Sequence, residues 1–296
     1  MEKVLRNKKA ILAFILPGLL AYTLFVFYPM CQSIYFTFFE GTPNVKFEFV
    51  KLDNYKRLFT DKNFINSFKV TMQYLLVTGT GWIVLGYGTA LLLRYGISSR
   101  RSNLARTIVY LPVVIPGVAA AALWAKIFEI SPQYGLLNSL LKAIGLESLV
   151  QPWIGTSATA MWAVCIAEMW KGIGYYAIIF YAGLLDIPKD LEEAASIDGA
   201  SRWQIVRHIV FPLMRPVLIM CIVLAIMNSL RVYDMPRILT NGGPGYATTT
   251  LSIYMYKVAF KQWKYGYGST IAVVTLLMTV ILTSIVKRLD RKEGAK

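Results

Sequence analysis

Long uncharged stretches recur along the chain, and short segments that carry most of the charged residues separate them. The hydrocarbon core of a bilayer is about 30 Å thick, so a helix that crosses it needs roughly 20 predominantly apolar residues. The pattern therefore predicts an all-α membrane protein with six transmembrane helices, at about residues 10–38, 66–93, 107–128, 157–185, 212–233 and 267–286.

The composition supports this interpretation. Of the 296 residues, 56% are apolar and only 16% are charged. A soluble domain of this size needs more charge to cover its surface, so the composition argues against a water-soluble enzyme. The net charge of +15 would suggest a nucleic-acid partner in a soluble protein, but in a membrane protein the placement of the basic residues matters more. We predict no nucleic-acid partner.

The distribution of basic residues predicts the topology. If the N-terminus is cytoplasmic, the segments on the cytoplasmic side have a higher density of Lys and Arg than the outside segments, as cytoplasmic segments usually do. Six crossings, an even number, then place the C-terminus in the cytoplasm as well. The first apolar run continues to Phe39 without a small-residue cleavage pattern, so we expect a retained anchor. The predicted organisation is a cytoplasmic tail over 1–9, a six-helix membrane domain over 10–286 and a cytoplasmic tail over 287–296.

Motifs for catalysis or cofactor binding are missing from the sequence. The chain contains neither a phosphate-binding GxxxxGK[ST] loop nor a GxGxxG. Its three cysteines lie in apolar stretches, and the single His208 excludes any site that needs two histidines. We therefore predict no catalytic residue, no metal and no cofactor.

Glycine and proline mark expected packing and bending. The second predicted helix carries four glycines, Gly79, Gly81, Gly86 and Gly88. Small residues let membrane helices approach closely, so we expect this helix to pack against a neighbour. Pro112 and Pro116 should bend or break the third helix.

The segment 186–211 carries helix signals of its own. Pro188 can open a short helix, and acidic residues in its early turns favour the positive end of the helix dipole. Gly199 then sits where the chain must turn. Apolar residues at helical spacing continue from Ser201 to Phe211, and Pro212 suits the first turn of the next helix.

This segment resembles the EAA signature of the membrane subunits of binding-protein-dependent ABC importers. The resemblance rests on Glu193, Ala194, Ala195, Gly199, Ile209 and Pro212 at their spacings, with Phe211 in place of the usual Leu. It implies the type I importer permease fold and a coupling helix that docks into a cytoplasmic ATPase dimer. The residues it assigns to that contact are Glu193, Ala194, Ala195, Asp198 and Gly199. A solvated amphipathic loop is the alternative.

Four further segments look like the carbohydrate branch of this family, similar to the larger permease subunit of maltose-type transporters: 52–61, 106–124, 181–201 and 239–260. The last contains a turn-rich LTNGGP stretch outside the fifth helix, where a substrate-delivering protein would dock. The resemblance implies uptake of a di- or oligosaccharide. It also implies a second permease subunit, an external sugar-binding protein and residence in the bacterial cell membrane as a multi-pass protein.

Polar residues within the predicted helices mark candidate positions of a translocation path. On the fourth helix they are Glu168, Lys171, Gly172 and Tyr175, of which the resemblance assigns sugar contact to the last two. Near the outer half of the fifth they are Asn228, Ser229 and Tyr233, whose groups suit sugar hydroxyls and rings. Glu168 and Lys171 share one helix face and are able to pair. Hydrogen bonding between helices, without substrate contact, stays an alternative for each residue.

A second class of function is an ion-gradient-driven secondary solute carrier. Such carriers usually contain internal repeats and a titratable relay at mid-membrane. The chain shows no clear repeat, and Glu168 beside Lys171 is the only candidate relay. A membrane-embedded enzyme would need a nucleophile with a base or a set of metal ligands, which the sequence does not offer.

Overall fold

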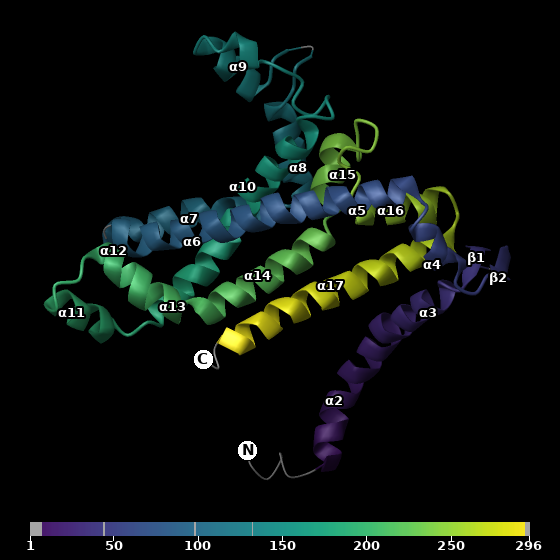
Figure 1. Cartoon of the computed structure of the whole chain (residues 1–296), viewed down its shortest axis with the longest axis horizontal. Coiled ribbons are helices and arrows are strands. Elements are labelled where there is room, and N and C mark those ends of the chain that lie inside the picture. The colour runs from purple at the N-terminus through teal and green to yellow at the C-terminus, as the bar shows by residue number, and fades with distance from the viewer. Residues whose placement is uncertain (1–7, 44, 98, 132, 294–296) are drawn as a thin grey trace. The chain divides into compact units, whose positions relative to one another are not determined.

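The structure is a computed structural model that describes residues 8–43, 45–97, 99–131 and 133–293. Residues 1–7 and 294–296, at the ends of the two predicted tails, lie outside this description. The chain forms two compact units, drawn in Figure 1. One comprises the residues up to Asp61 together with Met255–Leu276, and the other comprises Lys62–Tyr254 together with the residues from Leu277 onward.

The first unit combines apolar helices with a small hairpin. Its helical elements are α2 (Lys8–Tyr22), η1 (Thr23–Phe27), α3 (Tyr28–Phe36), α4 (Asp53–Leu58), η6 (Lys257–Lys261) and the first part of α17 (Tyr265–Glu293). Strand β1 (Phe39–Thr42) pairs antiparallel with β2 (Lys46–Phe49). The Tyr267 hydroxyl donates to Asp61 at 2.6 Å, and Arg57 lies 4.3 Å from the Tyr267 ring centroid. These contacts join the α4 region to α17.

The second unit holds the remaining helices. One continuous helix consists of α5 (Lys62–Tyr74), η2 (Leu75–Gly79), α6 (Thr80–Leu91) and η3 (Leu92–Gly96). The following elements are α7 (Ser99–Val114), α8 (Gly117–Ile127), α9 (Leu136–Ala143), η4 (Glu147–Leu149) and α10 (Ala160–Leu185). After them come α11 (Lys189–Ile197), α12 (Arg202–Ile205), η5 (Val206–Val210), α13 (Phe211–Leu213), α14 (Arg215–Leu230), α15 (Asp234–Thr240) and α16 (Leu251–Tyr256), which ends just inside the first unit.

Four of the six predicted stretches contain a helix that is able to cross a membrane by itself, and the other two contain bent helix pairs. Four described helices are long and apolar enough by themselves: Ile11–Phe36, Lys62–Gly96, Ala160–Leu185 and Tyr265–Asp290. Two further pairs qualify only together, Leu104–Val114 with Gly117–Ile127, bent by 97°, and Arg202–Leu213 with Arg215–Leu230, bent by 65°. The first bend confirms the break expected from Pro112 and Pro116, because proline removes a helical hydrogen bond and clashes with the preceding turn.

Helix α10 is the centre of the second unit and packs against α6, α7, α14 and α15. Its approach to α6 depends on glycine, because a Cβ at Gly86 would lie 2.9 Å from the Cβ of Tyr176. A Cβ at Gly81 would likewise collide with the Met169 side chain. The expectation that the glycines of the second span serve helix packing is therefore confirmed for these two positions.

Candidate functional site

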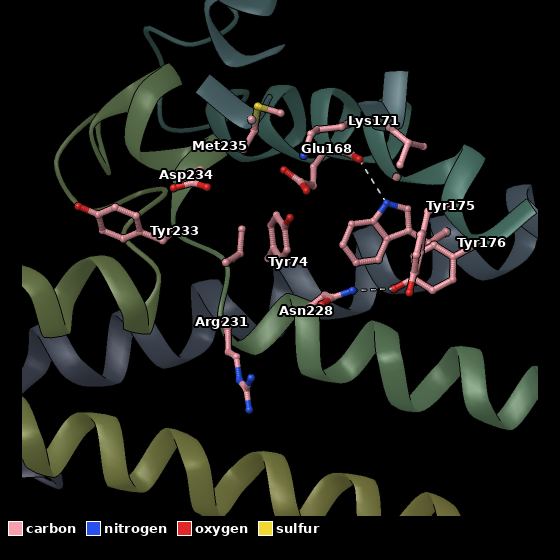
Figure 2. Close-up of a pocket in the computed structure, with 15 residues that line it drawn as sticks. Tyr74, Glu168, Lys171, Tyr175, Tyr176, Asn228, Arg231, Tyr233, Asp234 and Met235 are labelled. Carbon is pink, nitrogen blue, oxygen red and sulfur yellow. Dashed lines mark hydrogen bonds between the residues drawn. The ribbon is translucent and has the colours of Figure 1, made fainter. Parts of the chain in front are cut away.

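A polar cavity of about 460 Å³ opens between the helices of the second unit (Figure 2). Its lining comes from α5, α6, α10 and the α14–α15 connection, with contributions from α7 and the start of α8. The lining residues are Tyr74, Trp82, Val113, Gly117, Glu168, Lys171, Gly172, Tyr175, Tyr176, Asn228, Arg231, Val232, Tyr233, Asp234 and Met235. The cavity is large enough for a small molecule and is rich in hydrogen-bonding groups.

Aromatic rings form one wall of the cavity and hold one another in place. Trp82 stacks on Tyr176 with ring centroids 5.2 Å apart, and Tyr175 meets Tyr176 edge-on at 5.3 Å. The Trp82 indole Nε1 donates to the Glu168 carbonyl at 3.2 Å, and Asn228 Nδ2 donates to the Tyr176 hydroxyl at 3.3 Å. Figure 2 shows both hydrogen bonds. The wall is therefore preorganised by contacts between three helices.

Gly172 allows this wall to form. A Cβ at this position would collide with the Trp82 indole nitrogen. Trp82 is almost completely buried, so its ring has little room to withdraw. The absence of a side chain at residue 172 therefore keeps the indole next to α10.

Four ionisable side chains line the cavity: Glu168, Lys171, Arg231 and Asp234. None of them forms an ion pair within 4.0 Å with any other residue that the structure describes. A Cβ built on Gly117 would lie 3.6 Å from Asp234 Oδ2 and 3.8 Å from Lys171 Nζ, so these two groups border the same point. The pairing that the sequence allowed between Glu168 and Lys171 is not formed, and both side chains border the cavity instead.

The start of α8 also lines the cavity, at Gly117. Helix α8 begins at Gly117, directly after Pro116, and no side chain caps its first turn. Its first-turn amides have no partner within the helix.

The structure brings six of the seven predicted path residues to the cavity, and Ser229 is the exception. Ser229 is completely buried, and its Oγ has no hydrogen-bond partner among the described residues. It lies next to Gly79, where a Cβ on that glycine would be 3.9 Å from the Ser229 oxygen.

Sequence reasoning missed several lining residues, chiefly Tyr74, Trp82 and Tyr176. The signal that could have identified Trp82 is its position in the glycine-rich part of the second span. A large ring among glycines indicates a contact with a neighbouring helix that leaves space for the ring. The structure shows no group of three His, Cys, Asp or Glu among its described residues that could hold a metal ion.

A second candidate site is the segment from Pro188 to Val210. Helix α11 begins directly after Pro188, carries Asp190 and Glu192 in its first turn and has no buried residue. The chain then turns at Gly199, whose φ of +81° is in the left-handed region that glycine adopts without strain. Ser201 caps α12 in a capping box with Gln204. The predicted helix start and turn are therefore confirmed.

The five predicted contact residues share this projecting segment. Glu193, Ala194, Asp198 and Gly199 are exposed, and Ala195 is half-buried. Large apolar side chains accompany them, with Ile197 86% and Trp203 69% exposed. Exposed apolar groups next to charged ones are typical of a surface that binds another protein.

Glu192, to which the sequence assigned no contact, makes polar contacts between α11 and the bundle, and the half-buried Ala195 of the same helix packs against the hydrophobic core. The Glu192 Oε1 accepts hydrogen bonds from Arg94 Nη2 and, at 3.2 Å, from the Tyr95 hydroxyl. Glu192 is 98 residues from Arg94 in the sequence, and no local pattern links the two positions.

Comparison with known proteins gives the family. Residues 83–294 match the family model described as binding-protein-dependent transport system inner membrane component. The chain is 34% identical over 279 residues to the probable ABC transporter permease protein YurN of Bacillus subtilis, covering 94% of each chain. It is 33% identical over 278 residues to the trehalose/maltose transport system permease protein MalF of Thermococcus litoralis, covering 94% of this chain and 92% of the relative.

A solved structure gives the fold. A chain of a bacterial ABC transporter involved in the import of the acidic polysaccharide alginate superposes with a TM-score of 0.85 at 22% sequence identity, covering 98% of both chains. The fold is thus that of a type I ABC importer permease. By its family match and by these relatives, the chain belongs to the inner membrane components of binding-protein-dependent transport systems.

Proposed function

We propose that the chain is the transmembrane permease subunit of an ATP-driven, binding-protein-dependent importer of sugars, with di- and oligosaccharides as the substrate class. Relatives of similar length carry names that refer to trehalose and maltose, to multiple sugars and to starch degradation products. In this proposal the chain forms half of the translocation path, a second permease forms the other half, a cytoplasmic ATPase dimer supplies the energy, and an external sugar-binding protein delivers the cargo.

The proposed topology has six crossings, with each bent pair counted as one span and both termini in the cytoplasm. The denser basic residues on that side support it. Residues 10–286 then form the membrane domain, and residues 1–9 and 287–296 form the tails. The protein resides in the bacterial cell membrane as a multi-pass subunit.

One observation carries the proposal of ATPase coupling: α11 has no buried residue, although it carries apolar side chains. In water such a face is unfavourable, and a partner that covers it recovers the hydrophobic free energy. The chain lacks a phosphate loop, so a separate ATPase must supply the work. In this proposal Glu193 and Asp198 make polar contacts with it, Ala194 and Ala195 allow close approach, and Gly199 keeps the turn.

We assign the cavity to the substrate path. Tyr175 and Tyr233 offer aromatic faces to sugar rings, and Asn228 offers an amide to hydroxyl groups. Glu168 and Lys171 supply charged hydrogen-bonding groups, which are stronger than neutral ones. Gly172 shapes the wall because its lack of a side chain leaves space for the Trp82 indole.

The test uses the complete importer, with its ATPase, second permease and receptor, in proteoliposomes. Replacing Glu193 by Arg and Gly199 by Val should remove sugar uptake and receptor-stimulated ATP hydrolysis, because the contact charge is reversed and the turn is strained. Sugar binding by the receptor should be unchanged. Full uptake in this double variant would refute the coupling role.

The gradient-driven carrier is tested with the chain alone. Uptake by proteoliposomes that contain only this chain, driven by a proton or sodium gradient, would favour that alternative. Family membership favours the ATP-driven system, and we expect no gradient-driven uptake.

A further inference from the structure

Two adjacent carboxylates of α11 lie in different surroundings. Glu193 is exposed and forms no ion pair within the described part of the chain. Glu192 is turned toward the bundle, where Arg94 and Tyr95 donate to the same carboxylate oxygen. The side chains of Arg94 and Glu192 are only 10% and 18% exposed. The two glutamates therefore differ in their contacts, although they are adjacent in the sequence.

Arg94 depends on Glu192 for its charge compensation. Its Nη1 is buried and has no hydrogen-bond partner among the described residues, and its guanidinium lies 5.2 Å from the centroid of the Tyr95 ring. A buried cation that loses its only counterion is strongly unfavourable. The pair is thus a specific contact, unlike the exposed ion pairs on the rest of the surface.

Two hollows separate part of α11 from the bundle around the pair. They have volumes of about 720 and 490 Å³, and both are lined by Arg94, Tyr95, Glu192 and Glu193. No residue of helix α11 is fully buried, and its half-buried Ala195 packs against the hydrophobic core of the bundle. The pair bridges the space between α11 and the bundle.

The partner helix leads to the cavity. Arg94 and Tyr95 belong to η3, the last turn of the continuous helix Lys62–Gly96, which also carries Tyr74 and Trp82 at the cavity wall. With 35 residues this helix is about 50 Å long, whereas the hydrocarbon core is about 30 Å thick. Its end can therefore extend beyond the membrane to meet α11.

We propose that Arg94, Tyr95 and Glu192 are positioning residues that transmit displacements of α11 along the helix Lys62–Gly96 to the cavity. The inference rests on the proposed coupling function and adds the route within this subunit. It divides the work on α11: Glu193 faces the ATPase, and Glu192 holds the helix to the bundle. A helix is a suitable transmitter because it moves as a rigid element.

The experiment compares three variants of the complete importer in proteoliposomes. Glu192→Gln should lower receptor-stimulated ATP hydrolysis and uptake by about tenfold, within the range of coupling between sites in other proteins. Asp190→Asn, on the same helix, is the matched control, because Asp190 is exposed and has no ion pair among the described residues; it should behave like the wild type. The double variant Arg94→Glu with Glu192→Arg should recover most of the lost coupling.

A second readout separates transmission from folding. A single cysteine at residue 228, in a chain whose three native cysteines are replaced, reports the access of a thiol reagent to the cavity. Access should change with ATP in the parent chain, and Glu192→Gln should remove this change while the ATPase still co-purifies.

The outcomes distinguish this inference from the proposed function. Full coupling of Glu192→Gln in an importer whose wild type transports would overturn the inference alone. Loss of assembly in Glu192→Gln that the charge swap does not restore would also overturn it, because the pair would then serve only folding. A wild-type chain that binds no ATPase would overturn the proposed function.

Discussion

The cavity and the α11 segment differ in how their ionisable side chains are paired. Glu168, Lys171, Arg231 and Asp234 line the cavity, and none of them forms an ion pair with another described residue. At α11, the half-buried Glu192 accepts hydrogen bonds from Arg94 and Tyr95. A charged group that is not paired within the protein must be satisfied by water or by a bound solute. If the cavity is the substrate path, as we propose, these groups can bind a solute, whereas the Glu192 carboxylate already has its partners within the chain.

This difference separates two kinds of variant. Changes in the cavity should alter which solute is carried and how fast, while receptor-stimulated ATP hydrolysis continues. Changes at α11 should alter the stimulation itself. The amount of solute taken up per ATP hydrolysed, measured together with the receptor-stimulated rate of ATP hydrolysis, distinguishes cavity variants from α11 variants.

The largest expected effect is that of Gly172→Ala. The added methyl group collides with the buried Trp82 indole, and overpacking of this kind costs about 1–3 kcal/mol. We expect lower thermal stability of the purified complex and a loss of uptake of tenfold or more. Gly88→Ala is the control, because a Cβ there meets nothing within 4 Å. Equal behaviour of the two variants would contradict the role of Gly172 in shaping the wall.

The next effect concerns selectivity. Lys171→Gln and Glu168→Gln change the charge of the cavity in opposite directions, and a unit charge at close range near a protein surface contributes on the order of a few kcal/mol. We expect Lys171→Gln to lower the uptake of anionic glycosides relative to neutral ones by about three- to tenfold, and Glu168→Gln to shift the preference the other way. Competition assays with the complete importer measure both. Unchanged profiles would remove these residues from the path.

A smaller effect is expected for Trp82→Phe. The variant keeps an aromatic ring against Tyr176 and removes the hydrogen bond to the Glu168 carbonyl, which contributes about 1 kcal/mol. Uptake should fall by about two- to fivefold, with the stimulation of ATP hydrolysis retained. A loss of stimulation in this variant would break the division between the cavity and α11.

The smallest effect is expected for Ser201→Ala. This change removes the cap of α12, worth about 0.5 kcal/mol at an exposed position, and leaves the contacts of Glu192 and Glu193 unchanged. The unfolding midpoint should fall slightly and coupling should stay near the wild-type level. Strong uncoupling would mean that the orientation of α12 itself belongs to the coupling contact.

Features set by local sequence were predictable. The apolar length of four spans, the break at Pro112 and Pro116, and the start of α11 after Pro188 each depend on a few neighbouring residues, and the structure has all of them. The hairpin of β1 and β2 was not predicted, because its strands have only four residues each and no clear alternation.

Features set by helix rotation or by distant pairing were not predictable. Asn228 and Ser229 are adjacent, yet a rotation of about 100° per residue places one at the cavity and the other against Gly79. The sequence does not show which face of α14 is turned toward the cavity, because that orientation depends on where the neighbouring helices lie. The pairing of Arg94 with Glu192 depends in the same way on how α11 folds back toward η3.

The abrupt start of α8 at Gly117 has a practical consequence for mutagenesis of the cavity. Where a broken span begins anew, peptide groups themselves become part of the wall, and replacing side chains one by one leaves those groups in place. A scan of side-chain substitutions would thus not report any contribution of the main chain around Gly117, because each variant keeps the same peptide groups.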